Sequence, residues 1–338
     1  MPYPFTTGQT GRLPRFTTLV AAVAGVAAFA AALPSYAQSD YPSKPIRLIV
    51  PYAAGGFADT RARLISEQLG KALGQTVVVE NKAGAGGVIG TDAIAKAAPD
   101  GYVIGMGNLA PLSVNPTLMK NLPYQPLKDL APVVLIETGP LILSVGNSVP
   151  ARSVQELIAM AKKQPGKLAF GSSGVGGAHH LSGEMFKMQA RIDIVHVPYK
   201  GGNLAATDLL AGHIPMMFEM GYAALPSIKA NKIRPLAVTS TKRLAVLPDV
   251  PTLAESGLTG FESYNWQGIV APAGTPPAIL KRLNVEINKL LDAGPLKTAI
   301  VDSGSQVGGG TPQTFGAFIA SESAKWSALV KEADIRME

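Results

Sequence analysis

Short apolar runs alternate with stretches of helical spacing through the first third of the chain. The runs at 46–50, 76–80 and 102–106 have the length and near-continuous hydrophobicity of strands buried on both faces of a parallel sheet. Apolar residues recur between the first two runs at the spacing of one helix face: Ala62, Ile65, Leu69 and Leu73. Strands that alternate with helices in this way predict a mainly parallel sheet flanked by helices.

The same alternation returns in the middle of the chain, with expected strands at 194–197, 216–219 and 235–239. A long β-rich run at 132–145 precedes this middle part, and an expected strand at 264–271 follows it. We interpret these two segments as crossings between two domains. The first crossing is expected where Gly-Pro interrupts the long run.

The C-terminal part is predicted to be helical, because Thr275-Pro276 and Thr311-Pro312 each combine an N-cap residue with a proline at the first helical position. A mature chain of about 300 residues exceeds what one hydrophobic core comfortably holds. We therefore predict an α/β protein with two lobes and two crossings. Residues 38–139 together with 265–338 form a discontinuous lobe 1, and residues 140–264 form lobe 2.

The first 37 residues follow a different pattern. Arg12 and Arg15 precede an alanine-rich apolar run at 19–33, and Ser35 and Ala37 place small residues at the minus-three and minus-one positions of a cleavage site. The run is shorter than the roughly 20 residues that a transmembrane helix needs, so a signal peptide explains it better than a membrane anchor. The sequence predicts a periplasmic protein whose signal peptide, residues 1–37, is removed on export.

Composition and charge narrow the chemistry. The chain has no cysteine, which excludes disulfides, thiolate nucleophiles and cysteine-ligated zinc. The formal net charge of +7 includes the two leader arginines, and the other basic residues are scattered without interleaved aromatic residues. Binding to nucleic acid is therefore not expected, whereas a mild preference for anionic small molecules is.

Two glycine-rich loops follow predicted strands and precede predicted helices. The first lies within residues 46–63, and the second lies within residues 167–186. A helix N-terminus carries unsatisfied N–H donors and a partial positive charge, and glycine lets a ligand approach the backbone closely. Two such loops facing each other would hold a carboxylate without an arginine, assisted by the hydroxyls of Ser172 and Ser173.

Motifs for other chemistry are weaker. The segment 84–90 is G-x-G-x-x-x-G and not the spacing of a dinucleotide fingerprint. The Ser172-Ser173 pair lacks the G-x-S-x-G nucleophile elbow. His180 and Glu184 share a helix face, as metal ligands would, but a third ligand is missing nearby in the sequence. We therefore expect no cofactor, no metal and no catalytic residues.

Six segments of the mature chain carry a family resemblance. They lie at 41–56, 79–87, 99–102, 197–202, 247–252 and 271–276. In this order they resemble the periplasmic solute receptors of tripartite tricarboxylate transporters, the Bug-type family. The resemblance implies a Venus-flytrap binding protein of type II periplasmic topology. It also implies a carboxylated ligand held between two loops, which match Tyr52 to Asp59 and Ser172 to His179 here. Asp59 stands where the family usually has an aspartate, whereas Phe57 and Gly177 depart from its more frequent residues.

We expect a monomeric receptor that captures a small aliphatic or aromatic mono-, di- or tricarboxylate and delivers it to membrane components of a transporter, without catalysis. The expected ligand contacts in the loops are Tyr52, Ala53, Ala54, Gly55, Gly56, Phe57, Ala58, Asp59, Ser172, Ser173, Gly174, Val175, Gly176, Gly177, Ala178 and His179. Outside the loops they are Asn108, Tyr199, Asn203, Glu219, Asn265 and Trp266. Within this set, Tyr52, Phe57 and Trp266 are expected to wall the ligand. The polar residues expected at its far end are Asn108, Tyr199, Asn203, Glu219 and Asn265.

Two other hypotheses fit the same sequence. A secreted hydrolase or lyase would use Asp59 with His179 or His180, although an aspartate at a helix start is more often a cap that stabilises the loop. A sensor receptor that passes its signal to a membrane kinase would use the same binding chemistry and differ only in its partner. Catalytic turnover of a bound acid would distinguish the enzyme from both receptors.

Overall fold

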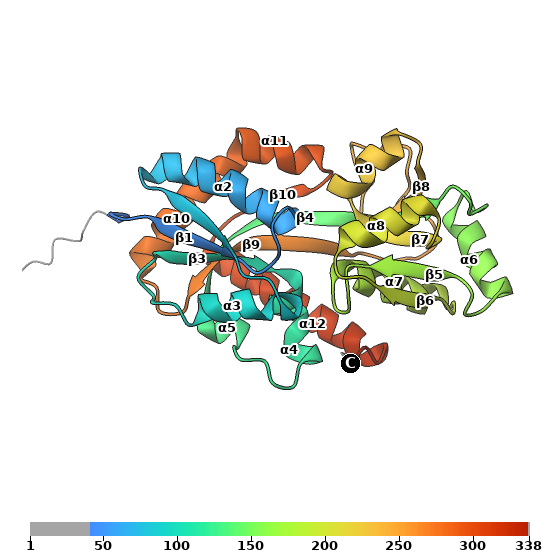
Figure 1. The fold of residues 1–338 in the computed structure, drawn as a ribbon, viewed down its shortest axis with the longest axis horizontal. Coiled ribbons are helices and arrows are strands. Elements are labelled where there is room, and N and C mark those ends of the chain that lie inside the picture. The colour runs from blue at the N-terminus through green and yellow to red at the C-terminus, as the bar shows by residue number, and fades with distance from the viewer. Residues whose placement is uncertain (1–40, 337–338) are drawn as a thin grey trace, which may run out of the picture. The chain divides into compact units, whose positions relative to one another are not determined.

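The computed structural model describes residues 41–336, which form a mixed α/β fold (Figure 1). The predicted signal peptide, residues 1–37, lies outside these residues. Ten strands within the described part of the chain join in one sheet. Their bounds are β1 (Ile46–Val50), β2 (Val77–Asn81), β3 (Val103–Asn108), β4 (Leu130–Gly146), β5 (Ala169–Ser172), β6 (Val195–Pro198), β7 (Met216–Met220), β8 (Ile233–Val238), β9 (Tyr264–Pro272) and β10 (Gln306–Gly309).

Helices flank the sheet. Their bounds are α2 (Phe57–Leu73), α3 (Val88–Ala95), α4 (Asn115–Leu118), α5 (Pro126–Asp129), α6 (Val154–Lys163), α7 (Ala178–Ala190), α8 (Gly202–Ala211), α9 (Gly221–Lys229), α10 (Pro277–Asp292), α11 (Pro295–Asp302) and α12 (Pro312–Glu332), with a 3₁₀ turn η1 (Ala85–Gly87) and a π turn η2 (Ala110–Val114). Glycine ends α2 as predicted, since Gly74 takes the left-handed φ of 70°. No helix in residues 41–336 combines the length and hydrophobicity needed to cross a membrane.

Each half of the sheet contains parallel strand pairs. Strand β1 pairs in parallel with β2 and β3, and β5 pairs in parallel with β6 and β7. The antiparallel pairs all involve β4 or β9, which join the two halves in the order β2-β1-β3-β9-β4-β7-β5-β6. The predicted α/β class, with mainly parallel strands flanked by helices, is confirmed.

Strand β4 runs from one half of the sheet into the other without a break (Figure 1). Residues 130–140 pair with β9, and residues 141–146 pair with β7 and β8 instead. Pro140 lies opposite Tyr264, the first residue of β9, so the two crossings are neighbours. The interruption expected at Gly139-Pro140 is therefore the point where β4 changes its partner strands. Pro140 has no N–H group to donate to a neighbouring strand. The predicted boundaries stay a prediction, and we use them to name lobe 1 and lobe 2.

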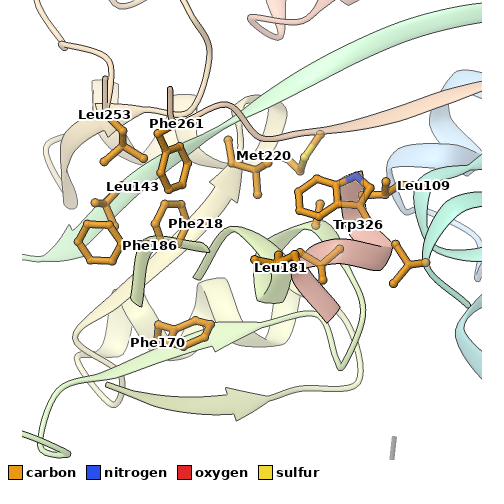
Figure 2. Close-up of a cluster of buried hydrophobic side chains, with 14 of the residues drawn as sticks. Leu109, Leu143, Phe170, Leu181, Phe186, Phe218, Met220, Leu253, Phe261 and Trp326 are labelled. Carbon is orange, nitrogen blue, oxygen red and sulfur yellow. The ribbon is translucent and has the colours of Figure 1, made fainter. Parts of the chain in front are cut away.

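One buried apolar cluster contains side chains of both lobes. Trp326 of α12 and Leu109 belong to lobe 1, and Leu181 of α7, Phe218 and Met220 belong to lobe 2 (Figure 2). Burying one large apolar side chain contributes roughly 1.5–3 kcal/mol. The lobes therefore share a packed base beside the crossing strands.

The structure corrects several local expectations. Residues 252–257, expected to be a short helix, form turns: Thr252 and Glu255 exchange capping hydrogen bonds, but Gly257, at a φ of 94°, ends the segment before a helix propagates. The sequence also did not predict α9, α11 or β10. In β10 a Cβ at Gly308 would lie 2.5 Å from Leu135 O, so the close approach to β4 requires glycine. Because glycine has no side chain, β10 lacks the run of apolar residues by which a strand is recognised in a sequence.

A buried ion pair ties helix α2 to both crossing strands. Arg61 Nε donates to Glu137 Oε1 of β4 (2.6 Å), and Gln267 of β9 donates to the same oxygen (2.7 Å). Arg61 Nη2 also donates to Ala299 O (2.9 Å) and to Ser303 Oγ (2.8 Å). Arg61 is 5% exposed and Glu137 is fully buried. Each charge therefore depends on the other, because an unpaired buried charge is costly.

Arg61→Met should destabilise the protein by about 3–5 kcal/mol, because it leaves the Glu137 carboxylate buried without its counter-ion. Adding Glu137→Leu should recover much of that loss. Arg243→Met is a matched control, since Arg243 pairs with Glu255 at about half exposure, and it should change stability far less. Urea unfolding near pH 7 measures all three variants. Equal losses for Arg61→Met and Arg243→Met would contradict the assignment.

Candidate functional site

A cavity of about 540 Å³ lies where the two lobes face each other. Lobe 1 lines it with the first glycine loop, with the 83–87 segment after β2 and with Asn108 at the end of β3. The other lining residues are Ser173, His179, Lys200, Gly201, Gly202, Asn203, Leu204, Tyr222 and Asn265. These positions are ends of strands and starts of helices, the usual place for a ligand in an α/β fold.

Five described helices begin at this cavity, and none of them has a side-chain N-cap. Their N-cap residues are Gly56 for α2, Gly87 for α3, Gly177 for α7, Gly201 for α8 and Met220 for α9. Among the described helices, side-chain caps occur only away from the cavity, at Ser153 for α6 and Thr311 for α12, although α4, α5, α10 and α11 also begin elsewhere without one. A helix start without a cap leaves N–H donors unsatisfied and carries the positive end of the helix dipole.

The described side chains of the wall add one positive charge and no negative charge to the positive ends of the helices. No carboxylate side chain of residues 41–336 lines the cavity, and its one lysine or arginine, Lys200, is exposed and makes no salt bridge within those residues. Burial lowers the pKa of His179 to about 4, so this ring is neutral at pH 7. Burial also raises the pKa of Tyr52 above its usual value, so its hydroxyl keeps its proton. The wall therefore suits an anion.

Most of the first predicted loop lines the cavity: Tyr52, Ala53, Ala54, Gly56, Phe57 and Ala58. Gly55 and Asp59 do not, and they hold the loop instead. Gly55 takes a left-handed φ of 80°, and its N–H donates to Asp59 Oδ2 (2.8 Å). Asn81 Nδ2 and Arg63 Nε also donate to Asp59, both at 2.9 Å. Burial raises the pKa of Asp59, but the hydrogen bonds from Arg63, Gly55 and Asn81 outweigh it and lower the pKa overall. Its carboxylate is committed to anchoring the loop.

The second predicted loop contributes only Ser173 and His179 to the wall, and Ser173 Oγ lies 2.8 Å from His179 Nδ1. Its other predicted residues do not line the cavity: Ser172, Gly174, Val175, Gly176, Gly177 and Ala178. The Ser172 hydroxyl, expected to face a ligand, does not line the cavity in this structure. Ser172 is fully buried, accepts from the Gly174 N–H (3.0 Å) and lies 2.6 Å from His196 Nε2. Val175 faces a separate cavity.

Outside the loops, three predicted residues line the cavity, Asn108, Asn203 and Asn265, and three do not, Tyr199, Glu219 and Trp266. The Tyr199 hydroxyl donates to Asp208 Oδ2 (2.7 Å). Trp266, expected to wall the ligand, is fully buried, and its ring packs edge-on against Phe315 (5.9 Å) and Phe318 (5.4 Å) of α12. Seven of the nine residues of β9 are buried, so alternation along the strand does not reveal which side chains face the ligand.

Sequence reasoning missed nine lining residues: Ala83, Gly84, Gly86, Gly87, Lys200, Gly201, Gly202, Leu204 and Tyr222. The first four follow β2, the parallel neighbour of β1. Because the carboxyl ends of parallel strands meet at one edge of a sheet, the rule that located the first loop would also have located this segment. Tyr222 is the second residue of α9, which the sequence did not predict. Its ring stacks on Phe57 of the other lobe, with centroids 5.2 Å apart and planes at 15°.

The histidines behind the second loop have structural partners. The His180 Nδ1 accepts from the Gly176 N–H (3.2 Å), and the ring stacks on His196 at 3.9 Å between centroids. Burial lowers the pKa of His180 to about 3 and the pKa of His196 to about 4, so both are neutral at pH 7. His180 Nε2 lies 3.8 Å from Glu184 Oε1. Residues 41–336 hold no group of three or more His, Cys, Asp or Glu that could bind a metal ion.

Comparison with known proteins places this geometry in a family context. A family model described as "Tripartite tricarboxylate transporter family receptor" matches residues 61–335. Protein BugT of Bordetella pertussis is 38% identical over 323 residues, which cover 95% of this chain and 99% of BugT. The structure of R. palustris Rpa4515 with adipate has a TM-score of 0.83 at 35% identity, covering 88% of this chain and 99% of that one. MatC from Rhodopseudomonas palustris with bound malate has a TM-score of 0.78 at 31% identity, covering 86% and 100%. The predicted family resemblance and two-lobed fold class are confirmed.

Glu219 is a buried acid beside the cavity wall. It lies on β7, is 3% exposed and makes no side-chain hydrogen bond within the described residues. Burial raises the pKa of Glu219 to about 7. Burial, and then the charge of Glu219, raise the pKa of Tyr222, so the two side chains lie close enough to interact. In the folded protein the Glu219 side chain is therefore uncharged below about pH 7 and negatively charged above it.

Glu219→Gln should stabilise the protein near pH 8 and leave its stability unchanged near pH 4. In the unfolded chain Glu219 loses its proton around pH 4.5, whereas the folded protein holds it to about pH 7. The folded state binds more protons between these values, so wild-type stability falls as pH rises through them. Above that range the difference should reach about 3 kcal/mol. Urea unfolding of both proteins from pH 4 to pH 8 measures it, and a difference that stays constant over this range would disprove the assignment.

Proposed function

The chain belongs to the receptor family of tripartite tricarboxylate transporters, and from this premise we propose that it captures a small carboxylate in the cavity between its lobes and delivers it to membrane components of such a transporter. The observation that carries the proposal is the convergence of helix starts without side-chain caps on a cavity whose described wall has no carboxylate. A carboxylate would accept several charge-assisted hydrogen bonds there, each worth about 1.5–3 kcal/mol.

The arginines near the first loop have other partners. Arg61 pairs with Glu137, and Arg63 pairs with Asp59. Neither arginine lines the cavity. The proposed carboxylate site therefore relies on backbone N–H groups, hydroxyls and helix dipoles, and it needs no guanidinium.

A dicarboxylate suits the cavity better than a monocarboxylate. Helix starts offer donors for one carboxylate, and Lys200, which makes no salt bridge within residues 41–336, offers a positive charge for another. The two relatives whose solved structures contain adipate and malate support this choice of ligand class. A cavity of about 540 Å³ has room for an acid of that size.

Binding is better supported than catalysis. The Ser173–His179 pair resembles the first two members of a hydrolytic triad, but no carboxylate of residues 41–336 lines the cavity to orient the imidazole. A His179 pKa of about 4 also makes the ring a weak base at pH 7. Asp59, which the hydrolase hypothesis also uses, accepts hydrogen bonds from Gly55, Arg63 and Asn81 and does not line the cavity.

We place the capture in the periplasm. The leader at 1–37 has the pattern of a signal peptide, and one solved relative, 35% identical to this chain, is the periplasmic binding protein BugD. A periplasmic receptor of a transporter family would hand its ligand to membrane partners. The proposal therefore includes a membrane transporter as the partner.

A thermal-unfolding panel with adipate, malate and hexanoate tests the proposal. A dicarboxylate at about a hundred times its dissociation constant should add about 2.7 kcal/mol of stability. Lys200→Met should weaken adipate binding by roughly three- to tenfold, because it removes the charge that meets the second carboxylate. The same variant should leave the weaker binding of hexanoate unchanged, since hexanoate has one carboxylate.

Two results would contradict the proposal. The first is a panel in which no acid stabilises the protein, even after aromatic and tricarboxylic acids are added. That result would show that the protein is not a carboxylate receptor. Mass spectrometry of a bound acid after prolonged incubation is the second check. Conversion to a product that stops in His179→Ala would show an enzyme instead.

A further inference from the structure

Ser173 and His179 form a hydrogen-bonded pair on the lobe 2 wall of the cavity. Both residues line the cavity, and Ser173 Oγ lies 2.8 Å from His179 Nδ1. A serine hydroxyl has one proton, and a neutral imidazole has one N–H. Either Ser173 donates to Nδ1 and has no proton left for a ligand, or Nδ1–H donates to Ser173 Oγ and the hydroxyl proton stays free.

The surroundings of the ring favour the second arrangement. A Cβ at Gly202 would lie 3.5 Å from both Cε1 and Nε2 of His179, so this edge of the ring packs against the first residue of α8. Helix α8 begins there without a side-chain cap, so its first N–H groups are donors and its dipole is positive. An acceptor nitrogen fits that position, and a second N–H does not. Since burial keeps the ring neutral at pH 7, its single proton lies on Nδ1.

Gly177 leaves room for this pair. Its backbone, at φ −76° and ψ 161°, is one that any residue adopts. A Cβ there would nevertheless lie 2.9 Å from Ser173 Oγ, closer than real Cβ contacts allow. A larger residue would rotate the hydroxyl away from His179. The glycine is therefore required by the Ser173 side chain and not by the backbone.

We propose that His179 is a positioning residue whose Nδ1–H holds Ser173 Oγ, so that Ser173 donates its hydroxyl proton to a ligand carboxylate. This inference rests on the proposed function and deepens it, because it names the chemical form that the second loop accepts. An Oγ that already accepts from Nδ1 offers the ligand a donor, as the helix-start N–H groups do. This end of the cavity selects an ionised carboxylate over a carboxamide, whose NH₂ would face donors.

Nitrogen-15 NMR of histidine-labelled protein tests the tautomer without any ligand. The chain has four histidines, and His179→Phe identifies the His179 signals by their loss. At pH 7 we expect a protonated Nδ1 and an unprotonated Nε2 on His179. A proton on Nε2, or on both nitrogens, overturns the inference. A purely structural role for His179 would not fix this tautomer.

Titration calorimetry with adipate tests the consequence for binding. Gly177→Ala should weaken adipate binding about tenfold in the wild-type background, because it displaces the Ser173 hydroxyl. It should have no further effect in Ser173→Ala, where that hydroxyl is absent. Gly316→Ala is the control, since its Cβ would meet Pro132 at an ordinary 3.6 Å, and it should bind adipate like the wild type. Additive losses from Gly177→Ala and Ser173→Ala overturn the inference.

The two proposals fail in different ways. If no acid binds, the proposed function fails, while the NMR spectrum still reports the His179 tautomer. If adipate binds tightly and the His179 proton lies on Nε2, the positioning role fails and the receptor function stands.

Discussion

Unsatisfied N–H groups at helix starts are the constraint on which this site depends. A helix leaves its first N–H groups without internal partners, and proteins usually satisfy them with a side-chain cap. Here Ser153 and Thr311 do so for two of the described helices that begin elsewhere, whereas glycine or methionine occupies the cap position of each described helix that begins at the cavity. The donors that a cap would consume stay available to an anion.

Helix α2 links this donor surface to the joint between the lobes. Its first residue, Phe57, lies on the cavity wall and stacks on Tyr222 of the other lobe. One turn later, Arg61 is buried against Glu137 of the crossing strand β4. Helix α2 therefore carries both an aromatic contact across the cavity and an ion pair at the crossing. The cavity wall and the packing of the joint share one helix.

The sequence predicted the framework better than the details of the wall. Strand and loop positions follow from apolar runs, glycine and caps, which are local signals, and both predicted loops reach the cavity through Phe57 and Ser173. The direction of a side chain is not local. Trp266 was expected at the ligand, but α12, far away in the sequence, supplies Phe315 and Phe318 to bury it. Tyr222 was missed because α9 begins at a glycine and contains a proline, which hide the helical pattern.

The central claim is that backbone N–H groups at helix starts, and not a basic side chain, hold the first carboxylate of the ligand, while Lys200 meets only the second. Amide proton and nitrogen shifts followed by NMR during titration with adipate test this most directly. The account predicts that the largest shifts belong to the first-turn amides of α2, α7 and α8, and that they persist in Lys200→Met at saturating adipate. Shifts confined to the surroundings of Lys200, and lost in Lys200→Met, would contradict it.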